Sequence, residues 1–188
     1  GHQLPSFGPL YNPDRPDWDF DPDKARNLLA EAGYDGTPIP YRVRAAAYGP
    51  ELATAQVLVS MWEAVGLNID LQIKENFGQL LEFPGTGMRN GVDPVLVADP
   101  LFGFWRSYNE SEREVWENEE FYELGHKLES SLDVEDRLEA YSAMMDIFDE
   151  DPPAFILHLM GTFYGKRKDI IWQPSESVFL QLAGASIE

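Results

Sequence analysis

Cysteine is absent from this chain of 188 residues. Disulfide bonds, thiol catalysis and metal sites held by cysteine are therefore excluded. Basic residues are also scarce, with 14 Lys and Arg against 33 Asp and Glu and a formal net charge of −19. Such an acidic chain cannot neutralise phosphates, so neither nucleic acid nor an anionic membrane surface is expected as a partner.

Long apolar runs and the common enzyme motifs are missing as well. No stretch approaches the roughly 20 apolar residues of a membrane-spanning helix. Gly85 and Gly87 are not followed by the Lys-Ser/Thr start of a phosphate-binding helix, and there is no Gly-x-Ser-x-Gly motif. The histidines His2, His126 and His158 are far apart and adjoin no nucleophile in a recognisable motif. We expect no catalysis, no cofactor and no metal.

The composition that remains is typical of a folded protein, with 44% hydrophobic and 13% aromatic residues. The length suits one domain with a core of its own. Residues 110–151 hold 16 of the 33 acidic residues and only three basic ones. Two solvated helix faces explain this acidic stretch, because a calcium loop would need carboxylates alternating with a glycine.

The first half of the chain predicts a helix followed by a strand–helix–strand unit. Asp21 and Gly33 are typical of the start and end of a helix over about residues 22–32. Hydrophobic periodicity then predicts a strand over 41–47, a helix over 51–65 and a strand over 68–74. The last strand is expected to turn Ile69, Leu71 and Ile73 inward. Such a unit is expected to have parallel strands.

The second half predicts two capped helices among shorter elements. Asn118 and Asp133 are the expected N-caps of helices over 119–131 and 134–149. The other expected elements are a short helix over 76–83, a buried strand over 94–98, an aromatic-rich loop over 99–109, and short strands over 154–160, 163–167 and 178–182.

Four stretches of this pattern resemble one family of binding proteins. They are FDPDKARNLLAEAGYDG from Phe20, EAVGLNIDL from Glu63, the acidic segments EEFYEL and LDVEDRLEAY from Glu119 and Leu132, and FDEDPPAFILH from Phe148. Together they resemble, in order, the solute-binding proteins of peptide, oligopeptide and nickel ABC importers. The stretch from Phe20 resembles the phrase that opens their C-terminal lobe.

The resemblance implies an α/β fold, namely the C-terminal lobe of a type II periplasmic-binding-protein fold, with a mixed sheet flanked by helices. The expected divisions are a proline-rich lead-in over 1–19, the lobe over 20–160, and a tail over 161–188 that returns toward an N-terminal lobe. The chain is thus expected to be a fragment of a longer protein. Its expected partners are that N-terminal lobe, a peptide or small-molecule solute, and the permease subunits of the importer.

Two loops are the expected solute-binding sites, because ligands of open α/β sheets gather beyond the carboxyl ends of the strands. The first contains Tyr48. By resemblance, the dipeptide-binding branch has an arginine for the peptide carboxylate there, and this chain has Ala46 instead. That departure argues against a dipeptide-type clamp, and Arg44 is interpreted as part of a solvated strand face.

The second loop begins at Asp99. By resemblance, an aspartate here pairs with the peptide amino terminus, although the carboxylate is also suited to a sugar hydroxyl or to capping the loop. Trp105 and Tyr108 are the expected aromatic walls of the site. Phe102 and Phe104 are expected to pack inside the protein instead.

These observations predict the solute-binding component of an ABC importer that captures peptides in the periplasm, or outside the cytoplasm on a lipid anchor. An oligosaccharide or an opine-like compound is the alternative solute. A stand-alone acidic α/β interaction domain or a hydrolase is the alternative from another class.

Overall fold

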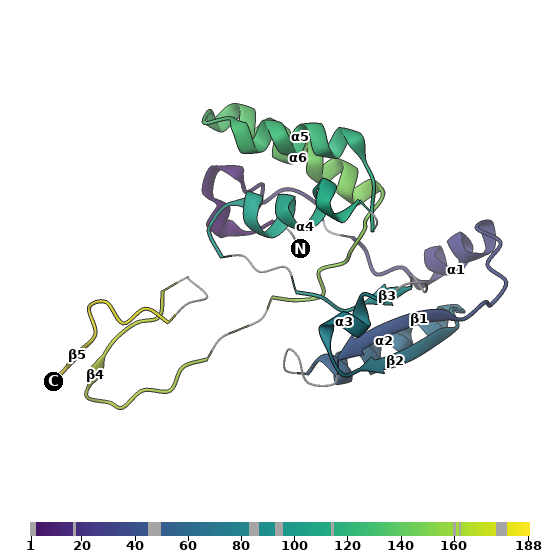
Figure 1. Cartoon of the computed structure of the whole chain (residues 1–188), viewed down its shortest axis with the longest axis horizontal. Coiled ribbons are helices and arrows are strands. Elements are labelled where there is room, and N and C mark those ends of the chain that lie inside the picture. Colours follow the sequence, from purple (N-terminus) through teal and green to yellow (C-terminus); the bar gives the residue numbers. More distant parts are fainter. Residues whose placement is uncertain are drawn as a thin grey trace. The chain divides into compact units, whose positions relative to one another are not determined.

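The computed structural model describes residues 3–16, 18–44, 50–82, 87–92, 96–113, 115–159, 161, 163–175 and 180–188. The chain divides into two compact units, each with a hydrophobic core of its own. The first unit combines Gly1–Arg15 with Asp93–Glu188, and the second spans Pro16–Val92. Figure 1 labels the elements of both.

The second unit is a small parallel sheet with helices. Its elements are α1 (Pro22–Glu31), β1 (Ile39–Arg44), α2 (Glu51–Val65), β2 (Ile69–Lys74), α3 (Phe77–Leu80) and β3 (Met88–Arg89). The strand order is β2-β1-β3, and β1 pairs in parallel with both neighbours. Ile39 lies opposite Ile69, and the register continues to Arg44 opposite Lys74. The predicted strand–helix–strand unit with parallel strands is confirmed (Figure 1).

Local signals fix the ends of these helices. The Asp21 carboxylate accepts a hydrogen bond from the Lys24 N–H at 2.8 Å, which satisfies a free donor of the first turn of α1. Gly33 and Gly66 follow α1 and α2 with φ of +67° and +107°, a left-handed conformation that suits glycine. The predicted helix starts and stops are confirmed.

The core of the second unit lies between β1 and α2. Tyr41 and Val43 are buried against Ala55 of α2, as their alternation in the sequence predicts. Ile69 is buried as well, but Ile73 is 55% exposed, so its predicted inward position is wrong. β2 is an edge strand, and packing therefore covers its side chains on fewer sides.

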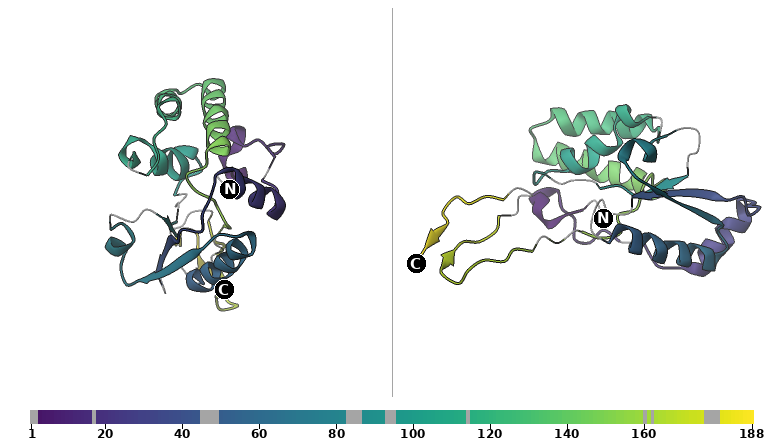
Figure 2. Two further views of the ribbon diagram at one scale, coloured as in Figure 1. Left: turned by 90° about the vertical axis from the view of Figure 1, so that its right-hand side faces the viewer. Right: turned by 60° about the horizontal axis from the view of Figure 1, so that its bottom comes forward.

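The first unit is mainly helical. Its elements are η1 (Pro5–Leu10), η2 (Leu101–Trp105), α4 (Arg106–Tyr108), η3 (Glu110–Glu112), α5 (Glu119–Ser130), α6 (Val134–Glu150), β4 (Ile170–Ile171) and β5 (Ser186–Ile187). The helices α5 and α6 run side by side (Figure 2). Asn118 and Asp133 accept backbone N–H groups at the starts of these two helices, so both predicted N-caps are confirmed.

Aromatic side chains fill the core of the first unit. Phe104 lies at its centre, in edge-to-face contact with Phe121, Tyr141 and Phe148. Phe7 and Leu10 of the lead-in are also buried in this core. The unit is therefore closed by two segments that are distant in the sequence.

An ion-pair network fastens the same lead-in to α6. The Arg15 guanidinium donates to Asp149 Oδ2 at 2.6 Å and to Asp146 Oδ1 at 2.8 Å. The Arg15 side chain is mostly buried, and the two carboxylates raise its pKa against the opposing effect of burial. The proline-rich lead-in is thus packed into the unit by both apolar and charged contacts.

The segment around residue 99 differs from the sequence prediction. A strand over 94–98 is not formed in its described part, residues 96–98, where Val97 is exposed. The third strand of the sheet is β3 instead. The predicted aromatic loop over 99–109 contains the helical turns η2 and α4. Their aromatic side chains reach the core by coiling against α5 and α6, which an extended loop would not allow.

The last 35 residues also differ from prediction. The described residues of 154–160 and 163–167, and residues 180–182, form no strand. Strands require a hydrogen-bonding partner, and the only pairing among the described residues of this region joins β4 to β5, in antiparallel fashion. Residues 178 and 179 lie outside the described residues. No helix among the described residues is long and apolar enough to span a membrane.

Candidate functional site

Asp99, a predicted solute-binding residue, lies just before the helical turn η2. Its Oδ1 accepts the Leu101 N–H at 2.9 Å, and its Oδ2 accepts a hydrogen bond from Arg137 of α6 at 2.6 Å. The Arg137 side chain is only 14% exposed, and the same guanidinium also donates to the Leu128 carbonyl at 2.7 Å. Both carboxylate oxygens of Asp99 are therefore occupied, and the pair fastens η2 to α5 and α6.

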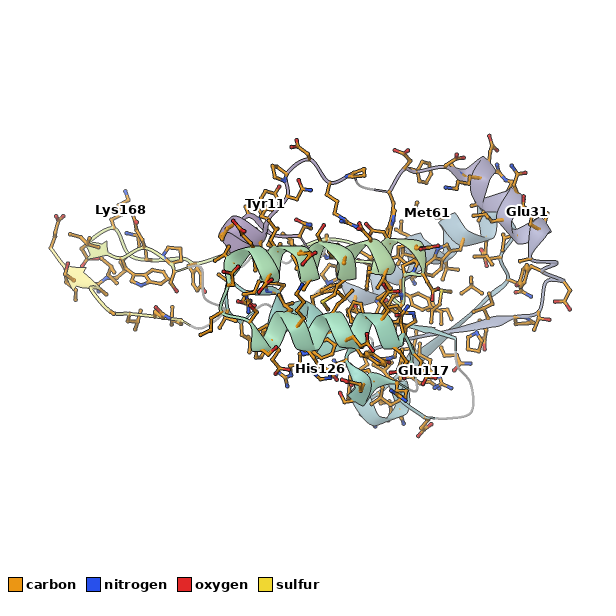
Figure 3. The ribbon with its side chains drawn as sticks, turned by 90° about the horizontal axis from the view of Figure 1, so that it is seen from above. Tyr11, Glu31, Met61, Glu117, His126 and Lys168 are labelled. Carbon is orange, nitrogen blue, oxygen red and sulfur yellow. The ribbon has the colours of Figure 1, made fainter. Side chains whose placement is uncertain are left out.

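Trp105 lies inside the first unit, with 5% of its surface exposed. Its ring packs against Phe121 and His126, and its indole N–H donates to Glu129 Oε2 at 3.3 Å. His126 lies on the outer side of α5 (Figure 3), where its ring also pairs with Glu110. The approach of the Trp105 ring to α5 is so close that residue 125 has to be glycine, since a Cβ there would lie 2.2 Å from the ring.

Tyr108 is buried next to Trp105 in the same core. Its ring lies edge-on to Phe104 and Phe148, at centroid distances of 6.0 and 5.2 Å. Phe104 is buried as expected. Phe102 is partly exposed and lies under the Arg106 guanidinium at 4.8 Å. Asp99, Trp105 and Tyr108 thus belong to one cluster of the first unit, and their contact with a solute stays a prediction.

Tyr48, the fourth predicted site residue, and Ala46 lie outside the described residues. The described residues on either side of this loop define the carboxyl end of β1. The Arg44 guanidinium lies over the Phe77 ring at 5.8 Å, and Arg44 Nε is buried. Arg44 is therefore packed at the end of the sheet, and its interpretation as a solvated strand face is wrong.

Glu51 is the buried acidic residue of this end of the sheet. Only 6% of its surface is exposed, although it lies in the first turn of α2 directly after Pro50. Its Oε1 accepts the Arg44 backbone N–H at 3.2 Å, which ties the start of α2 to the end of β1. Its Oε2 is buried, and no hydrogen-bond donor reaches it from the residues that the structure describes.

Tyr41 is a neighbour of Glu51, but its hydroxyl forms a hydrogen bond with another residue. It donates a hydrogen bond to Asn90 Oδ1. Burial raises the pKa of Tyr41 to about 12, with a smaller contribution from the negative charge of Glu51 and an opposing one from the Asn90 hydrogen bond. The side chain stays a neutral donor at ordinary pH and is engaged elsewhere.

Sequence reasoning missed Glu51 and Arg137. Glu51 resembles an ordinary acid in the first turn of a helix, which the helix dipole favours. The available signal was its place directly after the carboxyl end of a predicted parallel strand. Arg137 gave no signal, because its partner Asp99 is 38 residues away in the sequence.

Among the described residues, no group of three or more His, Asp and Glu is arranged to hold a metal ion. The chemistry at the carboxyl end of β1 is instead that of hydrogen bonding. Arg44 provides positive charge, Phe77 provides an apolar face and Glu51 provides an acceptor. Such a combination binds and orients polar groups, and it includes no nucleophile beside a general base.

Solved structures with the same fold are binding proteins. NikZ from Campylobacter jejuni, in complex with Ni(L-His), aligns with a TM-score of 0.56 and 17% identity. DppA from Helicobacter pylori, in complex with the peptide STSA, aligns with 0.60 and 18%, and a putative peptide-binding protein AppA from Clostridium difficile with 0.64 and 21%. The alignments cover 76–77% of this chain and 30–33% of those chains.

The fold is therefore that of a type II periplasmic binding protein, and the predicted α/β class is confirmed. The chain spans about a third of the length of these structures. Residues 1–109, more than half of the chain, match the sequence profile of the bacterial extracellular solute-binding proteins, family 5 Middle. The chain belongs to this family, and the predicted resemblance is confirmed. Comparison with curated protein sequences finds no significant match.

Proposed function

We propose that the chain is the C-terminal lobe of a binding protein that captures peptides outside the cytoplasm and delivers them to an ABC importer. The observation that carries this proposal is the family match over residues 1–109. The type II fold supports it independently. Proteins of this architecture hold a solute between two lobes that close by a hinge motion.

Peptides are the proposed solute because two of the structural neighbours named above are described in connection with peptides. DppA was solved with the peptide STSA, and AppA is described as a putative peptide-binding protein. NikZ, solved with Ni(L-His), makes a nickel chelate a second candidate. An oligosaccharide or an opine-like compound is a further alternative, supported by Ala46 in place of the expected arginine.

The apolar tail supports the proposal of a missing N-terminal lobe. Leu157 and Leu159 alternate along the chain and are each at least half exposed, and Phe163 is almost fully exposed. Apolar side chains in such a pattern favour a strand that packs against a partner. We assign this partner to the N-terminal lobe, with residues 161–188 returning toward it and residues 20–160 proposed as the C-terminal lobe.

The proposed residues of the solute-binding site are Tyr48 and, in the first unit, Asp99, Trp105 and Tyr108. A solute that takes Asp99 has to compete with Arg137 for Oδ2. Trp105 and Tyr108 are buried, so they contribute by shaping the segment that begins at Asp99 unless this segment moves. Tyr48 is the candidate for direct stacking.

The proposal is tested on the full-length gene product. Thermal shift and native mass spectrometry are used against di- to pentapeptides, oligosaccharides and Ni(L-His), with binding by peptides expected. Stabilisation by a non-peptide solute alone would overturn the peptide assignment. Absence of any bound solute would overturn the function itself.

A further inference from the structure

A groove opens on the first unit between the lead-in and the start of α6. Its volume is about 460 Å³. Residues 9–13 of the lead-in line one side, residues 135–142 of α6 line the other, and the buried side chains of Leu10 and Tyr141 lie at its base. Asp99, Trp105 and Tyr108 do not line it. The groove is therefore distinct from the candidate site in the same unit.

The apolar stripe of α6 extends into this groove beyond the aromatic core. Val134, Leu138, Tyr141, Met145 and Phe148 recur along α6 at helical spacing. The last three are buried, whereas Leu138 is 39% and Val134 is 50% exposed. Apolar side chains that continue a core-facing stripe without cover indicate a surface that packs against another molecule.

The lead-in side of the groove is fixed by contacts within the unit. The Gln3 side chain accepts the Asn12 N–H at 2.9 Å, and Arg15 fastens the end of the segment to α6 through its ion pairs. Pro9 and Pro13 restrict the backbone between these contacts. Tyr11 lies between the two prolines, beside α6 (Figure 3). A preformed wall of this kind loses little conformational entropy when a partner binds.

The α6 side of the groove is negatively charged. Glu135 and Glu139 line it, and no lysine or arginine does. Asp133 and Asp136 lie in the same first turn, so the partial positive charge of the helix N-terminus, about half a charge, offsets only part of theirs. Glu139 is already paired with Lys127 at 2.6 Å, whereas Glu135 has no ionic partner among the described residues.

The charge of the whole first unit has the same sign. Residues 1–15 and 93–188 contain 22 Asp and Glu but 8 Lys and Arg. Arg137, the basic residue of the first turns of α6, is paired with Asp99. A negative field of this kind attracts cationic partners and repels anionic ones.

We propose that this groove docks a segment of a partner protein in which an apolar side chain adjoins a lysine or arginine. The apolar side chain packs against Leu138 and Tyr11, and the cation lies beside Glu135. An acidic or a purely polar segment lacks one of these two complementary contacts. The inference goes beyond the proposed function, because the groove includes none of the residues proposed for the solute.

The test uses the full-length gene product and isothermal titration calorimetry with two blocked peptides, N-acetylated and C-amidated Lys-Leu-Leu-Lys and Gln-Leu-Leu-Gln. Blocking removes the terminal charges, so the difference between the peptides reports their side chains alone. The wild type is expected to bind the lysine peptide about threefold more tightly, the size of one exposed ion pair. High salt should remove most of this preference, because it screens exposed charges.

Two variants locate the binding in the groove. Glu135→Gln is expected to abolish the preference for lysine, because the amide keeps the shape and removes the charge. Leu138→Ser is expected to weaken both peptides by about threefold to tenfold through the lost apolar contact. Glu150→Gln, at the exposed far end of α6, and Val115→Ser, an exposed apolar residue outside the groove, are the matched controls and should behave as wild type.

The outcomes separate this groove from the solute-binding site. Affinities that Glu135→Gln and Leu138→Ser leave unchanged place the peptides elsewhere and overturn the proposal. Equal affinity of the wild type for both peptides, or no binding of either, overturns it as well and leaves the proposed function to its own solute test. Circular dichroism shows whether Leu138→Ser is folded, and Glu135→Gln, at an exposed position, decides the question even if it is not.

Discussion

At the scale of single residues, packing in the first unit leaves no room for substitution at several places. The clearest is Gly125 of α5, over which the Trp105 ring lies. Glycine is a poor helix former, so its presence in the middle of α5 makes sense only as space for this ring. The site cluster of Asp99, Trp105 and Tyr108 is thereby held against α5 by shape and not only by its ion pair.

Gly125→Ala is expected to destabilise the first unit by about 1–3 kcal/mol, because the added Cβ would lie 2.2 Å from the Trp105 ring. Helix propensity alone predicts the opposite sign, a gain of about 1 kcal/mol. Urea unfolding followed by tryptophan fluorescence measures the difference. Gly165→Ala, with open space around its Cβ and no left-handed backbone, is the control and should be nearly neutral. A stabilised Gly125→Ala would contradict this packing.

The raised pKa of Tyr41 predicts that the protein loses stability at alkaline pH. Its pKa is raised to about 12, mainly by burial, whereas an unfolded tyrosine ionises near pH 10. Above about pH 10 the unfolded state therefore loses a proton that the folded state keeps, and the free energy of unfolding falls until about pH 12. Urea unfolding between pH 8 and 11.5 measures this slope.

Tyr41→Phe is expected to flatten that slope by about one proton, apart from a constant loss of stability from the missing Asn90 hydrogen bond. Part of the slope remains, because burial also raises the pKa of Tyr141 in the first unit. An unchanged slope in Tyr41→Phe would show that the hydroxyl ionises as freely in the folded state as in the unfolded one.

At the scale of elements, the effect of a helix cap on stability depends on what the helix packs against. α6 contributes Tyr141, Met144 and Phe148 to the aromatic core, so its start is coupled to the whole first unit. α1 buries none of its residues, although it has an equally well-formed cap at Asp21. A short helix with little tertiary packing is marginal by itself, so this cap protects mainly local structure.

Asp133→Ala is therefore expected to lower the free energy of unfolding of the first unit by about 1 kcal/mol, since its carboxylate accepts the N–H groups of Glu135 and Asp136. Asp133→Ser keeps an acceptor and should recover most of the loss. Asp21→Ala should instead speed hydrogen exchange within α1 with little change in the unfolding midpoint. Equal effects of the two alanine variants on the midpoint would contradict this distinction.

At the scale of the whole molecule, the two units are connected differently along the chain. The second unit is one continuous segment, whereas the first needs the lead-in of residues 1–15 to complete its core. Phe7 fits edge-on against Tyr141, and Arg15 pairs with α6. The proline-rich lead-in is thus structural in the first unit.

Phe7→Ala is expected to destabilise the first unit by about 3–5 kcal/mol, as for other buried aromatic truncations. Hydrogen exchange read by mass spectrometry should show faster exchange in α5 and α6, with β1 and β2 unchanged. Phe20→Ala is the control, because Phe20 is 79% exposed. Equal loss of protection in β1 and β2 would show that the two units unfold together.

The sequence by itself determined the family and most of the regular elements. Helix starts at Asp21, Asn118 and Asp133 and the parallel unit of β1, α2 and β2 follow from neighbours a few residues apart. Capping and periodicity are local, so they can be read along the chain. Even the burial of Phe104 was predicted, although its helical conformation was not.

Only the tertiary structure decided what surrounds the candidate site. The pairing of Asp99 with Arg137, the burial of Trp105 and Tyr108, and the open oxygen of Glu51 depend on side chains brought together from distant parts of the chain. Burial and hydrogen-bond satisfaction are properties of the packed neighbourhood, which no local pattern specifies. The same reason explains why the predicted strands of the tail did not form, since a strand is completed by a partner and not by its own sequence.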